Sequence, residues 1–395
     1  MGCGGSKEIV FHKIPHKEYG LNLNPTNIGV FKRCEKSILL ENGETYSYYD
    51  IDSYSIFRLD KFSVIPILIL HDFSYSKEIF KTLIEKLIKV GFRCIVPDLR
   101  GHGKTTYKTT VNSLNDYIDD IKNLSDLIGI KKYHGIIGWS FGGAIALKIS
   151  IDLPDYLNKL VLINSIPVQG LKINFNFDSN EKENKERDTE NKESDKESDK
   201  ENRENDKEND KENKENYKEN KENNKQNDKQ NDKETNSKLI TKEMIRNYSD
   251  IKILMNFINE GCTNSNYIKI KEFFYKGDFN QNGKPTDETL FNLTNSLIEF
   301  KCPIDAFFLM ANFNISDDNT FTEGTNEINK IKIPILLLHG KKDCKINLQL
   351  KYDEIELLDK NQINYENYFY ENGGHFVLCD DFHIIIKKIK FFLKC

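Results

Sequence analysis

The sequence predicts an α/β fold in which a mostly parallel β-sheet is flanked by helices. Short, wholly apolar runs alternate with longer segments whose apolar residues recur at helical spacing. Strands buried on both faces of a parallel sheet have this wholly apolar character. The alternation is interrupted between about 168 and 330, which predicts an excursion from the sheet.

The first part of the chain supplies six expected strands and three helices. The first two strands form a hairpin with Asn42-Gly43 at its turn, and the first helix stops at Gly91. The expected strands are 37–43, 45–51, 64–70, 92–98, 133–139 and 157–167, and the expected helices are 77–91, 114–130 and 140–154.

The second part of the chain returns to the same alternation. A partly helical stretch over 239–328 comes first, and its composition suits a helical cap. Then follow an apolar strand at 333–340, a helix near 348–359, a strand at 366–373 and a final helix at 382–394. The sheet is therefore expected to resume after the cap.

A charged low-complexity insertion separates these two parts. Lys, Glu, Asn and Asp dominate residues 180–233, where Tyr217 is the only aromatic residue. Such a stretch cannot bury enough apolar surface to offset its ordering entropy, so disorder is expected. Whether the insertion binds a protein partner, and which one, is left open by the sequence. The expected divisions are an N-terminal acylated tail (1–30), the first part of the core (31–168), the charged insertion (169–238), a helical cap (239–328) and the second part of the core (329–395).

Composition excludes several classes of function. The 57 Lys and Arg residues are balanced by 62 Asp and Glu, so no domain-wide positive field favours nucleic acid. The eight cysteines show no C-x-x-C pair, which favours reduced thiols in a cytosolic setting. No cluster has metal-ligand spacing and no glycine run makes a phosphate loop, so no metal or cofactor is expected.

The hexapeptide "GWSFGG" at 138–143 is the clearest candidate for catalysis. It matches G-x-S-x-G, with Ser140 between Gly138 and Gly142, at a predicted strand-to-helix turn. Such a turn presents the serine hydroxyl at the carboxyl edge of the sheet, where side chains at the two glycine positions would clash. Ser140 is therefore the predicted nucleophile.

A serine nucleophile needs a base and an acid that orients it. In this architecture both should follow late strands. Asp343 follows "ILLLHGKK" and His375 follows "YENGG". The chain order Ser140, Asp343, His375 predicts nucleophile, acid and base.

The sequence resembles an α/β-hydrolase-fold serine hydrolase of the esterase or lipase type over roughly 35–170 and 325–395. Besides "GWSFGG", the motifs "LILHDF", "PDLRGHGKT" and "LLLHGKKD" stand in the family's order. The resemblance implies an oxyanion hole made by the backbone N–H groups of Phe73 and Phe141. The family usually has His-Gly where this chain has His71-Asp72. The aspartate places a carboxylate near the oxyanion, so an unusual local backbone or unusual pKa values are expected.

Other residues near these motifs are weaker candidates. His71, Asp72 and Trp139 are possible substrate-pocket residues, although a histidine after a strand is more often structural. Trp139, the single tryptophan, suits either the core or an acyl-pocket wall. Arg100 and Asp98 are expected to hold their loop together by hydrogen bonds.

The N-terminal sequence "MGCGGSK" matches a myristoylation signal. Gly2 becomes the terminal residue after Met1 is removed, and Cys3 beside it offers a palmitoylation site. Two acyl chains give stable membrane attachment, whereas one gives marginal binding. The expected location is the cytoplasmic face of a membrane, with the plasma membrane as the first choice.

Together these patterns predict a serine hydrolase that cleaves a carboxylic ester or thioester of a lipid or acylated substrate. A carboxylesterase of broad small-molecule specificity is an alternative. A non-catalytic adaptor with the same fold, binding a partner through its charged insertion, is the third hypothesis.

Overall fold

The computed structural model describes residues 31–53, 65–173, 240–261, 263–277, 287–319, 321–376 and 382–394. The predicted N-terminal tail lies outside the described residues, and so does the charged insertion beyond residue 173. None of the described helices is long and apolar enough to cross a lipid bilayer.

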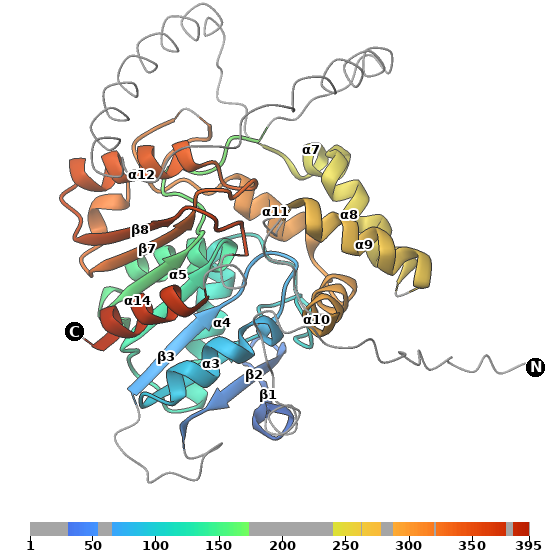
Figure 1. Cartoon of the computed structure of the whole chain (residues 1–395), viewed down its shortest axis with the longest axis horizontal. Coiled ribbons are helices and arrows are strands. Elements are labelled where there is room, and N and C mark those ends of the chain that lie inside the picture. The colour runs from blue at the N-terminus through green and yellow to red at the C-terminus, as the bar shows by residue number, and fades with distance from the viewer. Residues whose placement is uncertain are drawn as a thin grey trace, which may run out of the picture. The chain divides into compact units, whose positions relative to one another are not determined.

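An eight-stranded sheet forms the centre of the described structure (Figure 1). The strand order is β1-β2-β4-β3-β5-β6-β7-β8; β2 pairs antiparallel with β1 and β4, and the other neighbours are parallel. The strands are β1 (Glu35–Leu39), β2 (Thr45–Ile51), β3 (Ile65–Leu70), β4 (Phe92–Pro97), β5 (Gly135–Trp139), β6 (Leu160–Ile163), β7 (Ile335–Gly340) and β8 (Tyr365–Tyr370). The predicted fold class is confirmed.

Helices flank this sheet on both faces. In Figure 1, α3 and α14 lie in front of the strands, and α4 and α5 lie behind them. Every residue of β5, β6 and β7 is buried. This confirms the prediction from their apolar runs that these strands are covered on both faces. The flanking helices are α3 (Lys81–Ile88), α4 (Leu114–Leu127), α5 (Phe141–Asp152), α12 (Leu348–Lys360) and α14 (Phe382–Lys394).

Two of the predicted elements that are shorter than expected lead to the candidate site. The helix predicted over 77–91 starts as a 3-10 turn, η1 (Lys77–Phe80), before α3. The strand predicted over 157–167 is reduced to β6, because Asn164 turns the backbone into the left-handed region with φ 40°. That turn ends β6 at the carboxyl edge of the sheet, where the candidate site lies.

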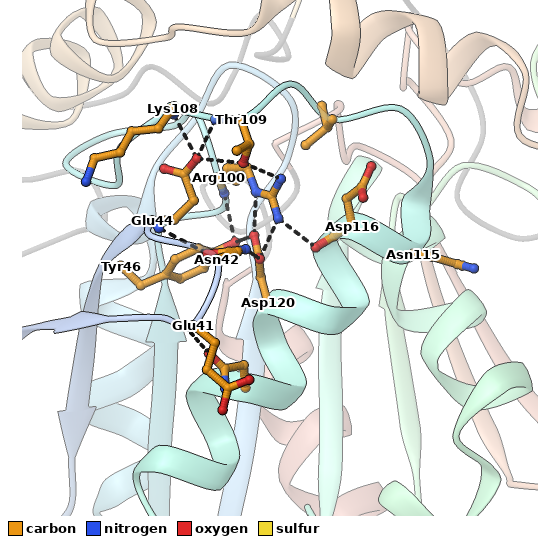
Figure 2. A network of polar contacts seen from close by, with 12 residues as sticks. Glu41, Asn42, Glu44, Tyr46, Arg100, Lys108, Thr109, Asn115, Asp116 and Asp120 are labelled. Atoms are coloured by element: carbon orange, nitrogen blue, oxygen red, sulfur yellow. Dashed lines mark hydrogen bonds and ion pairs between the residues drawn. The ribbon is translucent and has the colours of Figure 1, made fainter.

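The loop after β4 is held by a polar network (Figure 2). The Arg100 guanidinium donates two hydrogen bonds to Asp120 of α4, with Nε 2.7 Å from one carboxylate oxygen. The Tyr46 hydroxyl donates to the same carboxylate at 2.7 Å. Glu44 accepts from the backbone and the hydroxyl of Thr109 at 2.7 and 2.9 Å. Because the Arg100 guanidinium is paired with Asp120, Arg100 anchors the loop after β4, as the sequence predicted.

Among the described residues, the chain between β6 and β7 forms five further α-helices, of which the first three lie in the upper right of Figure 1. They belong to the same compact unit as the sheet. These helices are α7 (Lys242–Asn247), α8 (Ser249–Glu260), α9 (Asn264–Gly277), α10 (Asp287–Ile298) and α11 (Pro303–Ala311). The stretch just before α11 meets the β4 loop, where the Lys301 N–H donates to the Gly101 carbonyl at 2.8 Å.

Candidate active site

Ser140 occupies the sharp turn between β5 and α5. Its backbone has φ 50° and ψ −112°, an unusual conformation for a residue with a side chain, and only 4% of the residue is exposed. The turn is so crowded that a Cβ at Gly138 would lie 2.5 Å from the Gly142 carbonyl oxygen, and a Cβ at Gly142 would collide with the Leu70 carbonyl. Both glycines of the motif are therefore required for the turn.

Asp343 and His375 lie side by side, each just after the end of a late strand. The Asp343 carboxylate is 2.9 Å from His375 Nδ1, and its other oxygen accepts from the backbone N–H groups of Lys345 and Ile346 at 2.8 and 3.0 Å. Burial would raise the pKa of Asp343, but the neighbouring His375 and the backbone donors hold the pKa below its usual range. The structure thus brings the predicted acid and base together.

Asn164 supports the loops that carry this pair, and sequence reasoning missed it. Its amide nitrogen donates to the carbonyls of Gly374 and His375 at 2.8 and 2.7 Å, and its oxygen accepts from the Gly340 N–H at 2.9 Å. The Trp139 indole N–H donates to the same His375 carbonyl at 3.2 Å. The only available signal was a polar residue directly after the apolar run of β6.

The N–H groups of Phe73 and Phe141, the predicted oxyanion donors, point at one atom. That atom is Asp72 Oδ1, which lies 2.6 Å from the Phe73 nitrogen and 3.1 Å from the Phe141 nitrogen. Asp72 itself is 3% exposed. Two backbone N–H groups that converge on one oxygen have the arrangement of an oxyanion hole. In this structure a carboxylate of the chain fills it.

The second oxygen of Asp72 faces the predicted base. His375 Nε2 lies 3.1 Å from Asp72 Oδ2, and a hydrogen bond from Ser140 also helps to keep the pKa of Asp72 low against the effect of burial. His375 is therefore held between two carboxylates. Burial alone would lower the pKa of His375, but Asp343 and Asp72 outweigh it and raise the pKa to about 10. The imidazole is protonated at neutral pH in this arrangement.

His71 has a structural role. Its Nδ1 lies 2.8 Å from the Asp72 carbonyl and its Nε2 lies 2.9 Å from the Leu99 backbone nitrogen. A carbonyl only accepts and an amide N–H only donates, so the ring is neutral with its proton on Nδ1. Burial lowers the pKa of His71, which agrees with this state. His71 fixes the backbone of the residue that fills the oxyanion hole.

Trp139 is fully buried beneath the histidine loop. Its ring packs 4.7 Å from Tyr75, 4.9 Å from Phe376 and 5.7 Å from His375, measured between centroids. Of the two roles that the sequence left open, these contacts describe a core residue. The Trp139 ring packs beside the His375 imidazole and so helps to position the predicted base.

Aromatic residues of the chain between β6 and β7 border the loop that carries Asp72 and Phe73. The Phe73 ring makes edge contacts with Phe300 and Phe307, with centroids 4.9 and 5.8 Å apart. Phe307 in turn lies 5.5 Å from the Tyr248 ring. The half-buried Phe73 ring thus borders aromatic residues of the chain between β6 and β7. Within the described ranges, no group of three or more His, Cys, Asp or Glu side chains could hold a metal ion.

A comparison with known families assigns the fold. The family model for the alpha/beta hydrolase fold matches residues 65–382, most of the chain. The chain belongs to this family. The match spans the serine turn and both residues of the Asp343–His375 pair.

Curated relatives of this α/β hydrolase match over part of their length. A 2-hydroxy-6-oxononadienedioate/2-hydroxy-6-oxononatrienedioate hydrolase from a Pseudomonas species is 29% identical over 24% of this chain and 36% of its own. The bifunctional esterase/perhydrolase DCH from Acinetobacter calcoaceticus is 26% identical over 29% of this chain and 41% of its own. The chain therefore spans about two fifths or less of these relatives. Both are named as hydrolases or esterases, which supports a hydrolase.

Solved structures resemble this α/β hydrolase over nearly all of their length. An esterase from Exiguobacterium antarcticum has a TM-score of 0.56 and 16% identity, and covers 91% of this chain and 99% of its own. An esterase from Rhodococcus sp. has a TM-score of 0.56 and 12% identity, and covers 91% and 98%. At these identities the likeness shows the fold.

Proposed function

We propose that this α/β hydrolase is a serine hydrolase that cleaves a carboxylic ester or thioester. The observation that supports this most strongly is the convergence at one edge of the sheet. A serine on a strained turn, a histidine paired with a buried aspartate, and two backbone N–H groups aimed at one point meet there. These are the parts that acyl transfer requires.

The chemistry proceeds in two steps. Ser140 Oγ attacks the acyl carbon while its proton passes to His375 Nε2, and the carbonyl oxygen becomes an oxyanion between the Phe73 and Phe141 N–H groups. The oxyanion collapses, the bond to the leaving oxygen or sulfur breaks, and His375 protonates that atom. A water molecule then attacks the acyl-enzyme and gives one proton to His375. His375 passes that proton to Ser140 Oγ as the bond between Oγ and the acyl carbon breaks, which releases a carboxylic acid and regenerates Ser140.

A serine in this position favours acyl transfer over epoxide opening. One curated relative is a soluble epoxide hydrolase from a Corynebacterium strain, 28% identical over 30% of this chain and 40% of its own. In the family that the sequence resembles, members that open epoxides use an aspartate at the nucleophile position, whereas this chain has Ser140 there. Replacing Ser140 with Ala should abolish hydrolysis of p-nitrophenyl esters while the protein stays folded. Full activity in Ser140→Ala would refute the proposal.

The aromatic surface of the cap supports an apolar acyl group. Phe73, Phe300 and Phe307 lie together beside the oxyanion donors, so an acyl chain bound there would meet aromatic rings. A series of p-nitrophenyl esters from acetyl to palmitoyl tests this. A rate that rises toward long chains supports a lipid or acylated substrate. A rate that peaks at the shortest chains supports the alternative, a broad small-molecule carboxylesterase.

The occupied oxyanion hole gives specific support to a second candidate, a non-catalytic adaptor. With Asp72 Oδ1 on both N–H groups, the resting site has no room for an acyl carbonyl. A fluorophosphonate that labels active serines separates the two candidates, with Ser140→Ala as the control. Labelling of the wild-type chain at Ser140 supports the hydrolase, and failure to label supports the adaptor.

Membrane attachment through the N-terminus is part of the proposal. The motif with Gly2 and Cys3 lies outside the described residues, so its support is the sequence alone. Dual acylation would bring the enzyme to the cytoplasmic face of a membrane, where acyl lipids are concentrated. Labelling with an alkyne analogue of myristate tests this in the wild-type chain and in Gly2→Ala. Equal labelling of both chains would contradict it.

A further inference from the structure

The Asp72 carboxylate makes the same contacts that the carboxylate product of ester hydrolysis would make. Hydrolysis of an acyl-enzyme leaves a carboxylic acid whose one oxygen sits in the oxyanion hole and whose other oxygen faces the histidine. Asp72 Oδ1 lies 2.6 and 3.1 Å from the Phe73 and Phe141 nitrogens, and Asp72 Oδ2 lies 3.1 Å from His375 Nε2. The chain thus supplies its own occupant for the position that the product would take.

We propose that Asp72 is a specificity-determining residue whose side chain occupies the carboxylate-binding position of the site. It excludes free carboxylates, including the product, and an acyl carbonyl binds only by displacing it. This inference rests on the proposed function, because the excluded ligand is the acid that ester hydrolysis releases.

The charges around Asp72 explain the exclusion of anions. His375 is the cationic group in direct contact, and it is already shared with the buried carboxylate of Asp343. A product carboxylate would be a third negative charge on one imidazolium, which a buried site disfavours. Lys345 contributes only a more distant positive charge, and neutral His71 contributes none. Asp72 stays ionised at neutral pH, since its neighbours hold its pKa below the usual range despite burial.

The backbone of Asp72 is fixed, so displacement is a movement of the side chain. The Asp72 carbonyl accepts from His71 Nδ1 at 2.8 Å and from the Tyr75 N–H at 3.2 Å. Rotation of the carboxylate away from the two N–H groups frees the oxyanion hole without moving the loop. A neutral ester carbonyl can take the vacated place, because its arrival adds no charge to the pair of carboxylates.

Two substitutions separate occupancy from charge. Asp72→Gly removes the occupant and restores the residue that the family motif usually has. Asp72→Asn keeps a side-chain oxygen that can accept from both N–H groups but removes the negative charge. Asp155→Gly, which removes an exposed surface carboxylate, is the matched control. Thermal melting of each variant shows that it is folded.

The experiment measures hydrolysis of p-nitrophenyl butyrate and binding of sodium butyrate at neutral pH. Binding is followed by the fluorescence of Trp139, the single tryptophan of the chain, whose ring lies 5.7 Å from His375. In Asp72→Gly we expect hydrolysis to rise roughly tenfold or more, since hydrogen bonds to a charged group are each worth about such a factor. Butyrate should inhibit Asp72→Gly and change its fluorescence, and should do neither in the wild type, in Asp72→Asn or in Asp155→Gly.

Measuring hydrolysis and butyrate binding together also separates this inference from the proposed function. If Asp72→Gly binds butyrate but no variant hydrolyses an ester, the inference stands and the proposed function fails. If the wild type hydrolyses esters but binds butyrate as tightly as Asp72→Gly, the inference is overturned. A folded Asp72→Gly that hydrolyses more slowly than the wild type also overturns it, because Asp72 would then assist the reaction.

Discussion

The side-chain amide of Asn164 donates a hydrogen bond to the backbone carbonyl of His375, with the nitrogen and oxygen 2.7 Å apart. Through its carbonyl oxygen the same side chain accepts from Gly340, at the end of the strand that precedes Asp343. One residue at the end of β6 therefore holds both the loop of the acid and the loop of the base. The relative position of Asp343 and His375 depends on it.

Replacing Asn164 with Gly should lower kcat more than it changes KM. Glycine adopts the positive φ of 40° without strain, so the substitution removes the amide contacts alone. We expect kcat to fall roughly tenfold to a hundredfold and the free energy of unfolding to fall by about 1–3 kcal/mol, because buried partners lose their hydrogen bonds. Gln362→Gly is the control, since Gln362 has a similar φ of 56° in the turn after α12. An unchanged kcat in Asn164→Gly would contradict the positioning role.

The rate of ester hydrolysis should rise with pH well above neutrality. His375 must be neutral to accept the serine proton, and the two carboxylates raise its pKa to about 10. The ratio kcat/KM reports ionisation of the free enzyme, so it should increase from neutral pH toward about pH 10. Measuring methyl butyrate hydrolysis by automatic titration tests this. In Asp72→Asn the rise should move to lower pH, and a profile that does not move would contradict the contact between Asp72 and His375.

The contacts of His375 with Asp343 and Asp72 also predict how the stability of the protein depends on pH. A group whose pKa is raised by folding stabilises the protein fully below its unfolded value, about 6.5 for histidine. That stabilisation is lost as the pH rises through the folded value of about 10. The free energy of unfolding in urea should therefore decrease between these two values, by an amount on the order of a few kcal/mol. His375→Gln removes the titrating group, so its slope over this range should be much flatter; equal slopes would argue against a protonated His375.

Replacing Gly142 with Ala should impair the serine turn. The added Cβ would collide with the backbone carbonyls of Leu70 and His71, which cannot move without disturbing the end of β3. We expect loss of most esterase activity and a lower melting temperature. Gly129→Ala is the matched comparison, because a Cβ there meets nothing within 4 Å although φ is +77°. It should cost about 1 kcal/mol of stability and leave kcat unchanged.

The sheet could be read from the sequence because its parallel strands are short apolar runs. Buried strands such as β5 and β7 need side chains that suit both faces, and that requirement is visible without a structure. The strained turn at Ser140 was visible for a similar reason, since its two glycines are dictated by local crowding. Both requirements show as residue types within a short stretch of sequence, even where the crowding atom, such as the Leu70 carbonyl oxygen beside Gly142, belongs to another strand.

The function of Asp72 could be anticipated only in part. The sequence placed a carboxylate near the oxyanion hole, but its contact with His375 joins residues 303 positions apart. Which Asp72 oxygen faces His375 and which faces the Phe73 and Phe141 N–H groups depends on how the loops after β3, β5 and β8 meet at the edge of the sheet. Asn164 was missed for the same reason, because its partners are backbone groups of distant loops that have no sequence signature.

Mass spectrometry after reaction with a fluorophosphonate shows directly whether Ser140 is the acyl-accepting nucleophile. The wild-type chain and Asp72→Gly are each treated, digested and mapped, with Ser140→Ala as the control. We expect a single phosphonyl adduct on Ser140 that forms faster in Asp72→Gly and is absent from Ser140→Ala. An unmodified Ser140 in both reactive chains, or an adduct that persists in Ser140→Ala, would contradict it.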